Sequence, residues 1–104
     1  MNRATLTFVA SLAMTAAGSA SALTCEQQGN IAAGIMKSHQ LGVPLANIIK
    51  QFSIVSDPAA KQALEDMAVR AYDQPRYSTE SMQQRAIGAF RDEAVVECYR
   101  IFGK

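Results

Sequence analysis

Two cysteines, 73 residues apart, constrain the fold of this chain more than any other feature. Cys25 follows an apolar N-terminal stretch, and Cys98 lies six residues before the C-terminus. Cysteines in an exported chain usually form disulfides, and two cysteines allow only one intramolecular pairing. The chain-entropy model assigns a loop of this length about 4–5 kcal/mol. The sequence therefore predicts a small domain closed by a Cys25–Cys98 disulfide, with an intermolecular disulfide as the main alternative.

Residues 1–22 have the features of a secretory signal peptide. Arg3 supplies the basic n-region, and residues 4–17 form an apolar core that is too short to span a bilayer. Small residues follow and end in an A-x-A motif at Ala22, where we expect cleavage. The mature domain is then residues 23–104, and its expected location is the periplasm or the medium outside the cell.

The mature chain has about 82 residues, which is enough for one domain. Without Arg3, nine basic residues balance nine acidic residues, so the mature net charge is near zero. Nucleic-acid binders usually carry a basic excess or stripe, so this class is disfavoured. No second apolar run approaches the length of a membrane span, and membrane insertion is not expected after signal removal. Lipid attachment at Cys25 is disfavoured because the bulky Leu23 and then Thr24 precede it.

Four segments of the mature chain have apolar residues at three- and four-residue steps, which predicts an all-α bundle of about four helices. The expected helices cover residues 25–41, 44–52, 58 to just before Pro75, and 78–102. No alternating strand pattern and no internal repeat is present. If the first and last helices pack antiparallel, Cys25 and Cys98 come together.

Residues that favour helix ends support four of these boundaries. Thr24 and Gln27 form a T-x-x-Q capping box at the start of the first helix. Gly42 is expected just beyond its end, and Pro44 is expected at the first position of the second helix. Asp57 or Ser56 is the expected N-cap of the third helix, with Pro58 at its first position.

The last helix has an expected N-cap at Ser78, with Tyr77 and Met82 as a hydrophobic staple. Gly88 lies in the interior of this helix, where glycine costs about 1 kcal/mol relative to alanine. Gly88 therefore either lowers local stability or marks the close crossing of another helix.

Residues with catalytic or metal-binding chemistry are few. His39 is the only histidine, and no recognisable motif pairs it with a carboxylate. The acidic pairs 65–66 and 92–93 are adjacent on helices, where neighbouring side chains point in different directions. Two cysteines and one histidine do not make a four-ligand metal set. We expect no enzymatic activity, no cofactor and no metal, and a structural or surface role for His39.

The candidate binding residues are Tyr72, Arg76 and Tyr77, which flank the turn before the last helix. Tyrosine and arginine are the residue types that most often anchor protein interfaces. A structural interpretation competes with this one. Tyr77 then forms the staple, Tyr72 covers the end of the third helix, and Arg76 pairs with Asp73.

The mature chain resembles small exported two-cysteine helical proteins of Gram-negative bacteria, a group without an assigned function. The segments that carry the resemblance are Cys25, Ile35-Met36, Leu41-Gly42, Ala71-Tyr72, Pro75 to Glu80, Phe90 and Cys98. The resemblance implies a helical, disulfide-closed periplasmic domain and no catalytic residue. In size and architecture the chain is also similar to periplasmic acid-stress chaperones, which expose apolar surface at low pH.

Two functions are expected from these observations. The first is a non-enzymatic periplasmic or secreted protein that binds another periplasmic protein or acts like a chaperone. The alternative is a carrier of a small apolar ligand, with a pocket between helices that Tyr72 and Tyr77 gate. About 80 residues leave little room for both a core and a pocket of several hundred cubic ångströms.

Overall fold

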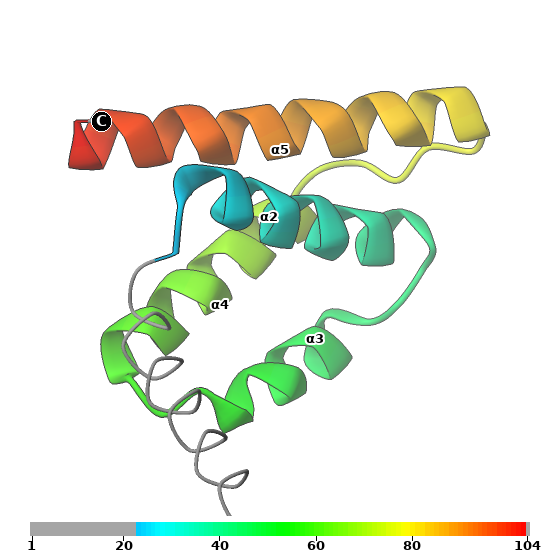
Figure 1. The fold of residues 1–104 in the computed structure, drawn as a ribbon. Helices are drawn as coiled ribbons and strands as arrows, with labels where there is room; N and C mark the ends of the chain where they lie inside the picture. Colours follow the sequence, from blue (N-terminus) through cyan, green and yellow to red (C-terminus); the bar gives the residue numbers. More distant parts are fainter. Residues whose placement is uncertain (1–22, 104) are drawn as a thin grey trace, which may run out of the picture.

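A computed structural model describes residues 23–103, and these residues form four α-helices and one 3₁₀ turn (Figure 1). The elements are α2 (Cys25–Gln40), α3 (Leu45–Gln51), η1 (Phe52–Ile54), α4 (Pro58–Tyr72) and α5 (Glu80–Phe102). No strand occurs among the described residues, so the predicted all-α class is confirmed. The predicted signal peptide, residues 1–22, lies outside the described residues.

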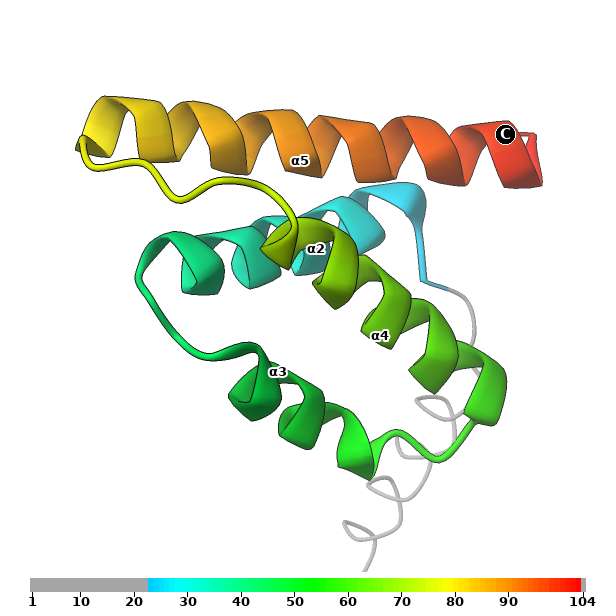
Figure 2. The same cartoon turned by 180° about the vertical axis from the view of Figure 1, so that it is seen from behind.

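The longest helix, α5, forms one edge of the molecule, and the other three described helices lie on one side of it (Figures 1 and 2). Its most extensive contact is with α2, which runs in the opposite direction. The next layer is α4, which packs against α2, and α3 packs against α4 in turn. Because α2 and α5 are antiparallel, the start of α2 lies beside the C-terminal part of α5.

The core is small and is built from all four helices. Its buried residues are Ala32, Ile35 and Met36 from α2, Ile48 from α3, Ala68 and Ala71 from α4, and Phe90 and Ala94 from α5. Three of the alanines are fully buried, which indicates close packing between α2 and α4. The predicted inner faces of the helices are confirmed at these positions. The apolar spacing also places Leu41, Met82, Ala89, Ile101 and Phe102 on these inner faces, but all five are exposed.

Both ends of α2 follow the predicted capping pattern. The Gln27 N–H donates to Thr24 Oγ1 at 3.0 Å, and the Thr24 N–H donates to Gln27 Oε1 at 2.8 Å. Gly42 has a φ of 86°, a left-handed conformation that glycine adopts without strain. The Val43 N–H then donates to the Ser38 carbonyl at 3.0 Å, as in a Schellman motif.

Two predicted helix starts are wrong by one residue. Pro44 is the N-cap of α3 rather than its first residue, because its ψ of 145° is extended and helical backbone begins at Leu45. Thr79 is the N-cap of α5 in place of Ser78. Thr79 has the extended backbone that a cap requires, and its Oγ1 accepts from the Met82 N–H at 3.2 Å.

The close approach between α2 and α5 occurs at Gly29 rather than at Gly88. A Cβ added to Gly88 would meet no atom within 4 Å, so of the two alternatives for Gly88 the close crossing is wrong. A Cβ added to Gly29 would lie 2.5 Å from Val95 Cγ2. The absence of a side chain at Gly29 therefore lets α2 lie directly against α5, close to the disulfide.

Candidate binding site

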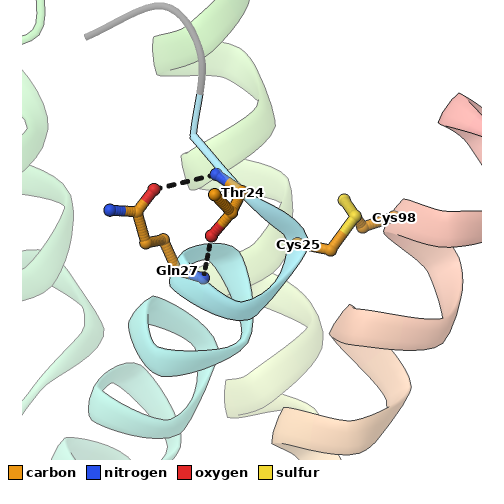
Figure 3. The surroundings of a disulfide bond; sticks show 4 residues. All are labelled: Thr24, Cys25, Gln27 and Cys98. Carbon is orange, nitrogen blue, oxygen red and sulfur yellow. Dashed lines mark hydrogen bonds between the residues drawn. A yellow bond between two sulfur atoms is a disulfide. The ribbon is translucent and has the colours of Figure 1, made fainter. Parts of the chain in front are cut away.

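The predicted disulfide is confirmed. The Cys25 and Cys98 sulfurs lie 2.01 Å apart, and their Cα atoms lie 5.5 Å apart (Figure 3). Cys25 is the first residue of α2 and lies within the capping box that Thr24 and Gln27 form, so the bridge fastens a well-capped helix start (Figure 3). Cys98 is only 3% exposed. The bridge joins α2 and α5 at one end of their antiparallel pair.

The connection between α4 and α5 is held by a buried glutamine at the end of α2. Gln40 is only 2% exposed. Its Nε2 donates to the Pro75 carbonyl at 2.9 Å, and its Oε1 accepts from the Tyr77 N–H at 2.8 Å. Arg76 reaches the Gln40 carbonyl at a longer distance of 3.5 Å. One side chain therefore satisfies two backbone groups of a segment more than thirty residues away.

Tyr72 and His39 pack together beside this connection. Their ring centroids are 4.3 Å apart, with a tilt of 46°. The Tyr72 hydroxyl donates to the Val43 carbonyl at 2.6 Å. His39 is 9% exposed, and its Nε2 lies 2.6 Å from the Gln74 carbonyl, so Nε2 carries a proton and donates. His39 thus has the structural role that we expected from the sequence.

The three predicted binding residues lie near one another at the end of α2. Tyr72 and Tyr77 are half-buried and Arg76 is exposed. All three make intramolecular contacts through a side chain or a backbone group. Tyr77 does so through its backbone N–H, and because Thr79 is the N-cap of α5, Tyr77 does not occupy the N′ position of the predicted hydrophobic staple. The partner of Arg76 differs from the expected one, because it contacts the Gln40 carbonyl and not Asp73. A role for these residues in binding a partner stays a prediction.

The burial of Tyr72 predicts sensitivity to alkaline pH. Burial raises the pKa of Tyr72 above its ordinary value of 10.0. The unfolded chain therefore ionises first, and the contribution of Tyr72 to stability is complete below pH 10 and is lost as pH rises through the folded pKa. Tyr72→Phe should remove this pH dependence and cost about 1 kcal/mol at pH 7, because the bond to Val43 is lost.

Urea unfolding of wild type and of Tyr72→Phe between pH 8 and pH 11 checks this expectation. Tyr99→Phe, which removes an exposed tyrosine, is the matched control. If wild type and Tyr72→Phe lose stability equally above pH 10, Tyr72 is not the group responsible.

An apolar groove lies at the disulfide end of the molecule, between the start of α2, α4 and the end of α5. Its volume is about 550 Å³. Apolar side chains make most of its wall, and these are Leu23, Ile31, Ala60, Ala63, Leu64, Met67, Ile101 and Phe102. Gln28 and Asp57 are the polar lining residues. Asp57 is also the N-cap of α4, as predicted, and its Oδ2 accepts from the Ala60 N–H at 3.1 Å.

The groove exists because α5 extends past the start of α2 (Figure 1). Cys98 is fixed opposite Cys25, the first residue of α2, so residues after Cys98 have no α2 residue to pack against. Ile101 and Phe102 are each 63% exposed as a result. Helical periodicity alone does not predict this groove. The signal in the sequence is the apolar pair that follows the second cysteine.

A smaller hollow of about 230 Å³ lies along the first half of α5. Met36, Tyr77, Met82 and Phe90 contribute to its lining. Tyr72 and Tyr77, which we expected to gate one pocket together, do not line the same hollow. Tyr77 lines only the smaller hollow, and Tyr72 lines neither. The larger groove is formed without either tyrosine.

In residues 23–103, no group of three histidine, cysteine or acidic side chains gathers where it can hold a metal ion. Nor does that part of the chain contain a helix of the length and apolarity that a membrane crossing requires. Comparisons of the chain with protein families, with curated proteins and with solved structures found no match.

Proposed function

We propose that this protein is a non-enzymatic exported protein that binds an apolar helical segment of another polypeptide in the groove at the disulfide end. The observation that carries this proposal is the open apolar groove, with Ile101 and Phe102 exposed at its edge. Contiguous exposed apolar surface of this kind is typical of interaction sites. If the bound segments belong to unfolded polypeptides, the protein acts like a chaperone.

The shape of the groove favours a polypeptide over a small ligand. Pockets for small ligands bury about 70–90% of the ligand surface. Here, Leu23, Ile101 and Phe102 are between 45% and 63% exposed, so an occupant must cover their outer surfaces as well as fill the hollow. An amphipathic helix does both, because its apolar residues at i, i+3, i+4 and i+7 form a continuous stripe that fits a groove between helices.

We also propose that the protein is periplasmic or secreted and begins at Leu23 after removal of residues 1–22. The disulfide supports this location, because such bonds form and persist in oxidising compartments. The composition of residues 1–22 supports it independently. Mass spectrometry of the exported protein checks both points. An uncleaved N-terminus or two free thiols would contradict them.

The groove is tested with a fluorescein-labelled amphipathic peptide that carries leucine at i, i+3, i+4 and i+7. The protein is expressed from the full chain and purified in its exported form, and binding is followed by fluorescence anisotropy. Ile101→Ser/Phe102→Ser should weaken binding at least about tenfold, because a buried side chain of this kind contributes about 1.5–3 kcal/mol.

Val69→Ser/Tyr99→Ser is the matched control for this experiment. Both of its residues are large, apolar and more than 40% exposed, but neither lines the groove. The control should bind the peptide as wild type does. Equal weakening in both variants, or no weakening in Ile101→Ser/Phe102→Ser, would rule out the groove as the binding site.

The second candidate function, a carrier of a small apolar ligand, is supported by the volume of the groove. The value of about 550 Å³ lies within the usual range of ligand pockets, about 300–1,000 Å³. Native mass spectrometry of the exported protein and titration with a fluorescent dodecanoate test this function. Dodecanoate binding that Ile101→Ser/Phe102→Ser abolishes, with no peptide binding by wild type, would favour the carrier.

A further inference from the structure

A second apolar surface runs along α5, away from the groove. Met82, Ala89 and Val96 follow one another at seven-residue spacing, which places them in one row along the helix. Met82 and Ala89 also line the smaller hollow, together with Met36 and Tyr77. All three are exposed, Met82 by 38% and Val96 by 52%. The row therefore makes no contribution to the core.

Opposite charges flank the middle of this row. Arg85 lies four residues before Ala89 and Glu93 lies four residues after it, about 6 Å along the axis in each direction. Both side chains are exposed. Among residues 23–103, the ion pairs include neither of them. Seven residues on either side of Ala89 the side chains are apolar, and four residues on either side they carry opposite charges.

We propose that two copies of this protein associate through this surface, with α5 antiparallel to α5 of the partner and a two-fold axis at Ala89. An antiparallel pairing about this axis places Arg85 opposite the partner's Glu93, and the symmetry repeats the pair. It also places Met82 opposite the partner's Val96. Ala89 meets its own copy at the centre, where a small side chain allows the two helices to approach closely.

The charges select a second copy in this orientation. A parallel pairing would place Arg85 beside the partner's Arg85 and Glu93 beside the partner's Glu93, and both contacts are repulsive. The mature chain has as many basic as acidic residues, so no net charge keeps copies apart. The smaller hollow supports the pairing, because Met82, Arg85, Ala89 and Glu93 all line it and a partner helix would cover it.

The expected association is weak and reversible. The paired stretch from Met82 to Val96 is about 21 Å long, and one helix pair of this length buries less than the about 800 Å² per partner of a standard interface. The groove stays accessible in this arrangement, because Ile101 and Phe102 lie on a different side of α5. Each dimer would then present two grooves.

Sedimentation velocity of the exported protein, at roughly 10 to 500 µM, tests the proposal over the range of a weak interface. Wild type should change from monomer to dimer as its concentration rises. Arg85→Glu and Glu93→Arg should each weaken association about tenfold, because two attractive pairs become repulsive. The double variant Arg85→Glu/Glu93→Arg restores both pairs with their signs exchanged, so it should associate as wild type does.

Lys50→Glu, which reverses an exposed charge on α3, is the matched control and should leave association unchanged. A second measurement uses Ala89→Cys, which should form an intermolecular disulfide between the two copies of position 89 while Cys25–Cys98 stays intact. A monomer at every concentration would overturn the proposal, and so would a dimer that is insensitive to both charge reversals. The groove variant Ile101→Ser/Phe102→Ser should not affect association, so this test is independent of the proposed function.

Discussion

Removal of the Cys25–Cys98 bridge is expected to lower the free energy of unfolding by about 4 kcal/mol. The bridge joins residues 73 apart, and the chain-entropy model gives a loop of this length a stabilisation of about 4 kcal/mol at 25 °C. Small domains have only about 5–15 kcal/mol of stability in total. Cys25→Ala/Cys98→Ala should therefore melt roughly 20 °C below wild type in a thermal scan followed by circular dichroism.

The end of α5 should respond first to this change. Tyr99, Arg100, Ile101 and Phe102 are all exposed, so few packing contacts hold the last turn once the bridge is gone. Hydrogen exchange at these amides should rise more than at Phe90, which lies in the core. Reduction of wild type with a dithiol should reproduce the result of the double variant. A double variant within 1 kcal/mol of wild type would contradict the expected role of the bridge.

The bridge therefore links the stability of the domain to the geometry of the groove. Leu23 precedes Cys25, while Ile101 and Phe102 follow Cys98, so the groove residues on both sides of the bridge are positioned by it. If the proposed function is right, the double variant should lose peptide binding at temperatures where its core is still folded. Loss of binding that occurs only together with global unfolding would show that the bridge has no separate effect on the groove.

The sequence predicted the helices because they depend on local residue patterns. It predicted the bridge because two cysteines allow only one intramolecular pairing. Apolar spacing defines each helix, Thr24 with Gln27 and Gly42 define the ends of α2, and two cysteines have one intramolecular pairing. The start of α5 was less well determined, because Ser78 and Thr79 are adjacent and both are good caps. The choice between them depends on the path of the preceding connection, which long-range contacts set.

The groove and the contact at Gly29 depend on how far one helix extends along another, and periodicity does not contain this information. Gly88 and Gly29 look equivalent as glycines within helices, yet only Gly29 faces a neighbouring helix. Ile101 and Phe102 continue the apolar stripe of α5 beyond the point where a partner helix is present. Such residues are distinguished from core residues only once the register of α2 against α5 is known.

Gln40→Ala is expected to lower the free energy of unfolding by about 3 kcal/mol. Gln40 is a polar residue with almost no exposure, and its amide satisfies the Pro75 carbonyl and the Tyr77 N–H. Its truncation leaves both partly buried backbone groups without these partners, and an unsatisfied group costs up to about 1–3 kcal/mol. Urea unfolding at pH 7 measures the loss of stability, and hydrogen exchange at the Tyr77 amide should rise at the same time.

Gln62→Ala is the matched control, because Gln62 is an exposed glutamine whose Nε2 donates to the exposed Asp66 side chain at 3.1 Å. Its expected cost is within about 0.5 kcal/mol of zero, as for most surface substitutions. Gln40→Met retains a side chain of similar length without the amide, and so separates the loss of packing from the loss of hydrogen bonds. If Gln40→Met is as stable as wild type, packing at this position matters and the two hydrogen bonds do not. If it is as unstable as Gln40→Ala, the amide of Gln40 fixes the connection that positions the start of α5.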